Sequence, residues 1–145
     1  SKPTVERWER SKEAIHGPIV LILKMLQKYP EYEQKVRVPE KIWPLRIWYM
    51  YDQDVCTLID VNERERKVKI RNYTDKVMFR AFGTVEDPNY NDYQEFLESR
   101  CFPESRDKMK LILKDLGLPF YDPIMIIEKT EGRMAEDNFW IRIER

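Results

Sequence analysis

The chain of 145 residues contains little cysteine, glycine or histidine: two, four and one residue, respectively. Cys56 and Cys101 are too far apart for a metal-binding cysteine pair, and a chain of this length needs no disulfide to fold. The four glycines are isolated, so they form no glycine-rich phosphate loop. The single His16 has no companion ligand or nucleophile for the common zinc or acyl-transfer sites. We therefore expect no metal, no cofactor and no enzymatic activity.

Long apolar runs are also lacking. Runs such as residues 19–23 are far shorter than the roughly 20 residues of a membrane-spanning helix. The first residues do not have the basic, apolar and small-residue order of a signal peptide. We expect a cytoplasmic protein without a membrane partner.

Charged residues make up 36% of the chain and apolar residues 42%, which is typical of a folded protein. The sequence predicts one domain over residues 1–145. Net charge is zero, yet residues 1–80 carry 17 Lys and Arg against 12 Asp and Glu, and residues 81–145 carry 9 against 14. Such segregation favours electrostatically steered association, unless folding interleaves the two halves.

The first 30 residues have helical spacing. Thr4 is a candidate N-cap for a first helix, and Pro18 suits the first turn of a second. Apolar residues then recur on one side of the second helix: Ile19, Ile22, Leu23, Met25 and Leu26. The pattern predicts a helical hairpin over residues 1–30.

From residue 45 the apolar period changes to two. Residues 46–51, 55–61 and 67–73 are rich in β-branched and aromatic residues, which predicts an antiparallel meander over residues 45–73. Val68 and Ile70 would then face a core, and the intervening cations would face outward.

Helices are predicted over residues 90–132, followed by a closing strand over residues 138–143. Asn91 or Asp92 would cap the first helix, Glu104 or Ser105 would begin the second, and Asp122 would cap the third. The expected fold class is α+β: an N-terminal helical hairpin and an antiparallel sheet of three to four strands with helices packed on one side.

Two arginines, Arg100 and Arg106, flank a proline, and carboxylates follow at Asp122 and Asp137. Guanidinium groups pair bidentately with carboxylates, so these four residues are candidates for structural ion pairs. The alternative is an arginine pair that binds a phosphate or an acidic partner.

Lys67, Lys69 and Arg71 alternate along one predicted strand. Cations near aromatic rings can form a nucleic-acid surface, whereas a solvated outer strand face has the same pattern.

Four aromatic residues fall outside the clearest apolar stripes, and Trp and Tyr are common interface residues. The candidates for partner binding are Trp8, Trp43, Trp48 and Tyr51. The alternative is that each is an ordinary core residue.

The arginine segment 100–106, the apolar helix after it and the segment 132–141, which ends in Asp137, Phe139 and Trp140, resemble a known arrangement. They are similar to the segment before the kinase core in HipA-like toxin kinases of bacterial toxin–antitoxin and mobile-element loci. The resemblance covers roughly residues 48–143. The chain lacks the ATP-binding lysine and catalytic aspartates of that core, so the resemblance implies an interaction module without kinase activity.

These observations predict a non-enzymatic, protein-binding regulatory module of a bacterial mobile-element or conflict system. Two alternatives stay open. One is a phage-encoded inhibitor of a host defence nuclease, of the anti-CRISPR type, and the other is a nucleic-acid-binding protein that uses the basic strand.

Overall fold

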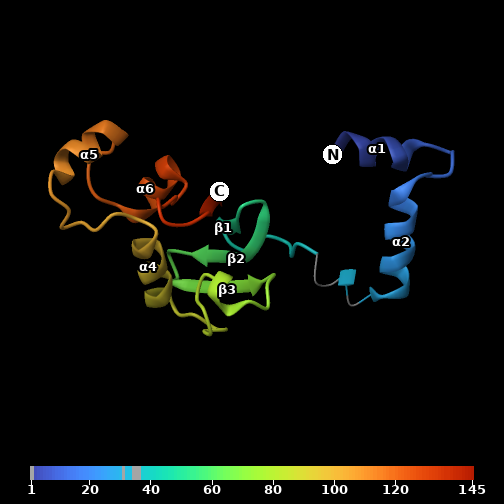
Figure 1. Cartoon of the computed structure of the whole chain (residues 1–145), viewed down its shortest axis with the longest axis horizontal. Coiled ribbons are helices and arrows are strands. Elements are labelled where there is room, and N and C mark those ends of the chain that lie inside the picture. Colours follow the sequence, from blue (N-terminus) through green and yellow to red (C-terminus); the bar gives the residue numbers. More distant parts are fainter. Residues whose placement is uncertain (1, 31, 34–36) are drawn as a thin grey trace. The chain divides into compact units, whose positions relative to one another are not determined.

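A computed structural model describes residues 2–30, 32–33 and 37–145. Contacts divide the chain into two compact units, Ser1–Pro39 and Glu40–Arg145. Figure 1 shows the first unit in blue and the second from cyan to red. The sequence predicts one domain, whereas these contacts define two units, so each unit is described by itself.

The first unit contains two helices, α1 (Lys2–Arg10) and α2 (Pro18–Lys28). The N-terminal helices are therefore present as predicted, but Thr4 lies inside α1 and does not cap it. Gly17 precedes α2 with a φ of 96°, a backbone conformation that glycine adopts without steric cost. Pro18 then opens α2, where its missing N–H costs no helical hydrogen bond.

The second unit contains a sheet of four antiparallel strands: β1 (Leu45–Tyr51), β2 (Asp54–Asn62), β3 (Lys67–Asn72) and β4 (Phe139–Glu144). Their order across the sheet is β3-β2-β1-β4. The closing strand β4 pairs with β1, with Trp48 opposite Arg142 and Met50 opposite Trp140. The predicted antiparallel sheet is confirmed, and β3 and β4 are its edge strands.

Four helical segments belong to the second unit: η1 (Val77–Phe79), α4 (Tyr90–Ser99), α5 (Met109–Leu116) and α6 (Pro123–Thr130). The predicted cap of α6 is confirmed, because the Asp122 carboxylate accepts a hydrogen bond from the Met125 N–H at 3.0 Å. The predicted cap of α4 is wrong. Asn89 caps this helix in a reciprocal capping box with Asp92. The helix expected from Glu104 or Ser105 begins only at Met109.

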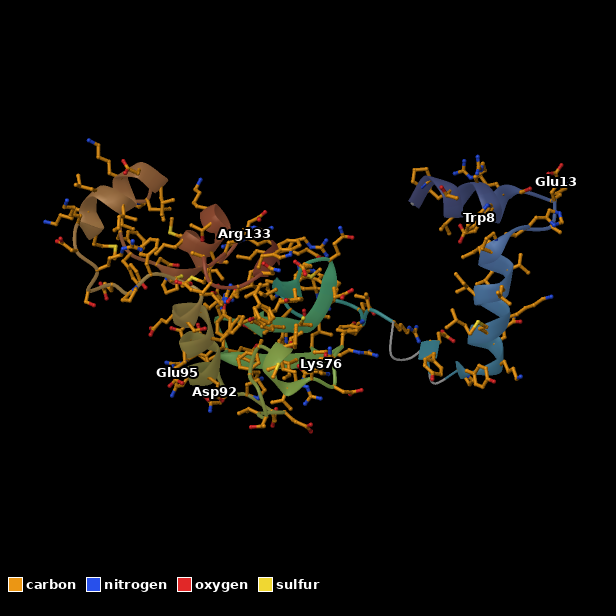
Figure 2. The ribbon with its side chains drawn as sticks, in the orientation of Figure 1. Trp8, Glu13, Lys76, Asp92, Glu95 and Arg133 are labelled. Carbon is orange, nitrogen blue, oxygen red and sulfur yellow. The ribbon has the colours of Figure 1, made fainter. Side chains whose placement is uncertain are left out.

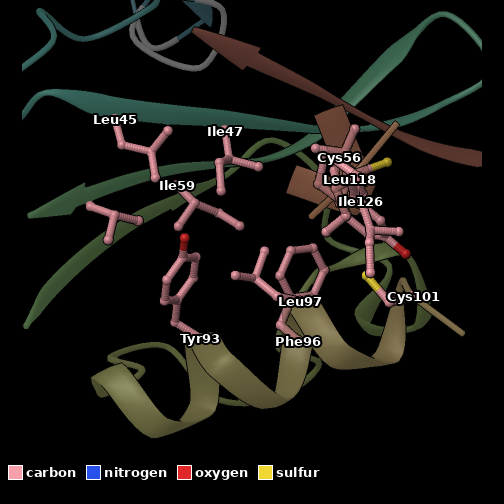
Figure 3. Close-up of a cluster of buried hydrophobic side chains, with 14 residues drawn as sticks. Leu45, Ile47, Cys56, Ile59, Tyr93, Phe96, Leu97, Cys101, Leu118 and Ile126 are labelled. Carbon is pink, nitrogen blue, oxygen red and sulfur yellow. The ribbon is translucent and has the colours of Figure 1, made fainter. Parts of the chain in front are cut away.

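Side chains of α4 and α6 pack against one face of the sheet, which we call the helix face. Figure 3 shows Tyr93, Phe96 and Leu97 of α4 directed toward Ile47 and Ile59 of the sheet. Full burial of one such side chain contributes about 1.5–3 kcal/mol. This cluster is therefore the main core of the second unit.

The other side of the sheet, which we call the opposite face, carries a smaller buried cluster. Its buried members are Trp48, Met50 and Leu58, and Trp140 and Tyr73 pack around them. Strand side chains alternate between faces, so Trp48 and Met50 point away from Ile47 and Tyr49. Within the described residues, this cluster contains no helical side chain.

Candidate binding surfaces

Helix α2 displays apolar side chains to solvent. Leu21, Ile22 and Met25 are 64%, 51% and 55% exposed. Residues three and four apart lie on the same side of a helix, so these three form one stripe, which we call the α2 stripe. Within α2, all of whose residues are described, none is buried. Single exposed apolar side chains are ordinary, whereas a contiguous stripe marks an interaction surface.

Two lysines accompany the α2 stripe. Lys24 is exposed between Ile22 and Met25 in sequence, and Lys28 is exposed at the end of the helix. The Lys28 ammonium lies 5.4 Å from the centre of the Tyr29 ring, and Tyr29 itself is exposed. The surface is thus an apolar stripe beside positive charge.

The four aromatic candidates for partner binding do not form one surface. Trp8 belongs to the first unit, where it extends from α1 half-buried (Figure 2), whereas the other three belong to the second unit. Trp43 is half-buried before β1. Trp48 and Tyr51 lie on opposite faces of the sheet, because one belongs to the opposite-face cluster and the other packs against the main core.

The expectation that Trp48 is an exposed anchor needs correction, because Trp48 is only 7% exposed. Its indole N–H donates to the Glu144 carboxylate at 3.2 Å, and the Arg142 guanidinium lies 4.7 Å from the ring centre. Tyr51 contacts Phe79 edge-on, with ring centroids 4.7 Å apart. Both residues therefore have intramolecular packing roles.

The opposite face also contains a buried ion pair. Arg46 donates to both carboxylate oxygens of Asp60, at 2.6 and 2.8 Å, and the two residues are 3% and 5% exposed. They are direct partners in the β1–β2 register. The hydrogen bond to Asp60 raises the pKa of Arg46 above its ordinary value, so the guanidinium remains charged.

The three basic candidates for nucleic-acid binding lie together on the opposite face. Lys67, Lys69 and Arg71 alternate along β3, where Lys69 pairs with Asp60 and Arg71 with Leu58. Lys67 and Lys69 are exposed, but Lys67 already forms a 2.7 Å ion pair with Glu65. The Arg71 guanidinium lies 5.3 Å from the centre of the Tyr73 ring. The predicted alternation is confirmed: Val68 and Ile70 pack against the main core.

Arg100 connects three segments of the second unit. It ends α4, is 7% exposed, and donates to both oxygens of Asp137 at 2.7 and 3.1 Å. It also donates to the carbonyls of Gly132, at 2.8 and 3.0 Å, and of Phe139, at 3.0 Å. The hydrogen bond from Arg100 holds the pKa of Asp137 below its usual value. This geometry fixes the 132–139 segment to α4 and leaves the guanidinium little room for an external anion.

Gly132 lets this network close tightly. Its φ is 59°, and an added Cβ would lie 3.1 Å from the Ile141 side chain and 3.4 Å from the Arg100 side chain. Any other residue would strain the backbone and press on both neighbours.

Within the described residues, Arg106 and Asp122 do not form the ion pairs predicted for them. Arg106 is exposed, and its guanidinium lies 5.8 Å from the centre of the Phe102 ring. Asp122 caps α6. Among the residues that the structure describes, neither forms an ion pair with Arg100 or Asp137.

Both thiols are buried in the main core. Burial raises the pKa of Cys101 to about 12 and also raises the pKa of Cys56. Both therefore stay protonated near neutral pH, a state in which thiols are weak nucleophiles and metal ligands.

Two features were missed by the sequence analysis. The predicted apolar side of the second helix included Ile22 and Met25 but not Leu21, and its spacing alone does not show whether it faces a core or a partner. The Arg46–Asp60 pair was not considered. The sequence signal for this pair was one charged residue, Arg46 or Asp60, in each of two otherwise strongly apolar strands.

No family model, curated protein or solved structure matches the chain. In the described ranges, no three His, Cys, Asp or Glu side chains are grouped so that they could hold a metal ion. A separate search of these ranges finds no helix with the length and apolar character that a bilayer crossing requires.

Proposed function

We propose that the chain is a non-enzymatic, protein-binding regulatory module and that α2 inserts into an apolar groove of its partner. The observation that carries this proposal is the exposure of Leu21, Ile22 and Met25 on one side of the helix. Recognition of an amphipathic helix in a groove uses anchors with this three- and four-residue spacing. Lys24 and Lys28 beside the stripe favour a groove with an acidic rim.

The resemblance to the segment before the HipA-like kinase core supports a setting in a bacterial mobile-element or conflict system. The 132–139 segment and the Arg100–Asp137 pair, which belong to the resembling region, form a rigid support in the second unit. We infer that the second unit is a scaffold and that the first unit provides the regulatory contact.

The proposal is tested by capture from a lysate of the native host with the tagged full-length chain. Leu21→Glu combined with Met25→Glu should weaken partner binding at least about 100-fold and reduce the captured partner accordingly. This estimate follows because two buried apolar anchors contribute about 1.5–3 kcal/mol each. Quantitative mass spectrometry of the captured proteins measures the change.

Met78→Glu is the matched control, because Met78 is 81% exposed and belongs to the second unit. It should leave capture unchanged. Equal capture by the stripe variant, or no partner of the wild type, would contradict the proposal. The identity of the partner separates a toxin-system protein from a host defence nuclease, which the inhibitor hypothesis predicts.

Nucleic-acid binding is a second candidate function, supported by the alignment of Lys67, Lys69 and Arg71 on one face of β3. The second unit as a whole has 18 Lys and Arg against 21 Asp and Glu, which is unfavourable for a polyanion. Acidic side chains such as Asp92 and Glu95 project from α4 (Figure 2). In the same assay, capture that nuclease treatment abolishes and that alanine at the three basic positions removes would support this candidate instead.

A further inference from the structure

The two edge strands of the sheet differ in how they meet solvent. β3 carries only positive charges, Lys67, Lys69 and Arg71, which discourage pairing with another strand of the same kind, whereas β4 carries both signs, Arg142 and Glu144. β4 is bordered by a groove of about 650 Å³ that runs between it and α6. The groove lining includes Ile127, Glu128, Glu131, Ile141, Ile143 and Arg145.

Only some of the backbone N–H and C=O groups at the outer edge of β4 have hydrogen-bond partners among the described residues. In an antiparallel pair, alternate residues hydrogen-bond to the neighbouring strand, and the Ile141 N–H points away from β1, so the odd-numbered residues of β4 direct their N–H and C=O groups outward. The Ile141 N–H donates to the Glu131 carbonyl at 2.7 Å, and the Phe139 carbonyl accepts from Arg100. Among the described residues, the N–H and C=O of Ile143 have no hydrogen-bond partner. The accessible edge is therefore short and centred on Ile143.

We propose that β4 pairs antiparallel with β4 of a second copy of this chain, around a twofold axis at Ile143. The two Ile143 residues would exchange a pair of backbone hydrogen bonds. Each Arg145 N–H would donate to the Ile141 carbonyl of the other copy. This arrangement leaves the Ile141 N–H on Glu131, where the structure places it.

Charge complementarity selects this register among its neighbours. With Ile143 opposite Ile143, Arg142 faces Glu144 of the second copy twice, on the opposite face of the sheet. Pairing Ile141 with Ile143 would place Arg142 against Arg142, and pairing Ile143 with Arg145 would place Glu144 against Glu144. Pairing Ile141 with itself needs an N–H that Glu131 already binds. Only one register combines free backbone groups with opposite charges.

Self-association through β4 goes beyond the proposed function, since it uses a different unit from the α2 stripe. Sedimentation velocity of the full chain over a concentration series measures it. We expect the wild type to dimerise. Arg142→Glu and Glu144→Arg should each raise the dimer dissociation constant about tenfold or more, because each single change places two like-charge pairs across the interface.

Mixing the two single variants makes the test specific. A heterodimer of Arg142→Glu with Glu144→Arg pairs opposite charges again, so an equimolar mixture should recover association. The double variant Arg142→Glu/Glu144→Arg should also dimerise as the wild type does. A monomeric wild type at about 1 mM, normal dimers of either single variant, or no recovery in the mixture would overturn the proposal.

Two controls separate this interface from other effects. Arg133→Glu alters an exposed arginine outside β4 and should leave the dimer intact (Figure 2). Thermal melting of the single variants verifies that they fold, since Arg142 and Glu144 also contact Trp48. The Leu21→Glu/Met25→Glu variant should dimerise normally. Loss of the dimer in that variant alone would assign self-association to α2 and reject pairing through β4, whereas the partner-capture result is independent of both outcomes.

Discussion

Each face of the sheet has one buried arginine that pairs with a carboxylate, buried in Asp60 and partly exposed in Asp137, and the two pairs connect different parts of the fold. On the helix face, Arg100 reaches Asp137 and the carbonyls of Gly132 and Phe139, 32 to 39 residues away in sequence. On the opposite face, Arg46 binds Asp60 of the adjacent strand, 14 residues away. The first pair fixes the tertiary arrangement of α4, the 132–139 segment and β4, and the second fixes the register of two neighbouring strands.

The two pairs differ in how many groups lose a hydrogen-bond partner when one member of the pair is removed. Removing Arg100 takes this donor from the Gly132 and Phe139 carbonyls and from Asp137, whose Oδ1 still accepts from the Phe139 N–H. Removing Asp60 takes the carboxylate from one guanidinium, that of Arg46. Breaking a buried pair costs the desolvation of every group left unpaired. We therefore expect removal of Arg100 to lower the free energy of unfolding more than removal of Asp60.

The largest expected effect is that of Arg100→Ala. It should lower the free energy of unfolding by about 3–5 kcal/mol, because one buried and two partly buried acceptors lose this donor together. Arg133→Ala is the matched control: the ion pair of Arg133 with Glu131 is exposed and should contribute less than about 1 kcal/mol. Urea denaturation followed by circular dichroism measures both. Equal, small losses for the two variants would show that the network contributes little to stability.

A smaller effect is expected on the opposite face. Asp60→Ala should lower the free energy of unfolding by about 3 kcal/mol, because the buried Arg46 loses its hydrogen bonds to this carboxylate. Replacing both residues by apolar ones, Arg46→Met with Asp60→Leu, should recover most of this loss, as buried ion pairs often do no better than apolar packing. The same denaturation assay applies. A double variant that is less stable than Asp60→Ala would indicate a net stabilising pair.

The comparison also shows which features of the fold could be predicted. The period-two pattern around Val68 and Ile70 predicted the sheet and the outward direction of Lys67 and Lys69, because strand side chains alternate. The closing strand was predicted from its aromatic and β-branched residues. The Arg46–Asp60 pair could not be predicted, since it depends on an irregularity between Tyr49 and Met50 that shifts the register set by the turn and places Arg46 opposite Asp60.

The candidate site was harder to predict than the fold. The sequence indicated an apolar side of α2 that included Ile22 and Met25, but only the structure shows that these two and Leu21 are exposed. Trp48 was chosen as an exposed aromatic, and its burial depends on Met50, Leu58 and Trp140 packing around it. Burial is a property of the assembled contacts, so a local pattern could not supply it.

The smallest expected effect concerns the charge of Asp137 and depends on pH. Asp137→Asn keeps the size of the side chain but removes its charge, so it should cost about 1–2 kcal/mol near pH 7, within the range of hydrogen bonds to charged groups. Because the pKa of Asp137 is lowered in the folded chain, its contribution is complete above the unfolded value of about 3.9 and is lost as the pH falls through the folded value. The stability gap between wild type and variant should therefore stay constant from about pH 8 to pH 5 and close below about pH 4.

Denaturation curves across this pH range measure that gap, with Glu136→Gln as the control because Glu136 is an exposed neighbouring carboxylate. The control should show almost no gap at any pH. A stability gap for Asp137→Asn that persists unchanged at pH 3 would mean that Asp137 binds Arg100 through the geometry of its hydrogen bonds and not through its charge. The Arg100–Asp137 pair would then act as an uncharged hydrogen bond. The larger effect on stability of removing Arg100, compared with Asp60, would come only from its hydrogen bonds to the Gly132 and Phe139 carbonyls.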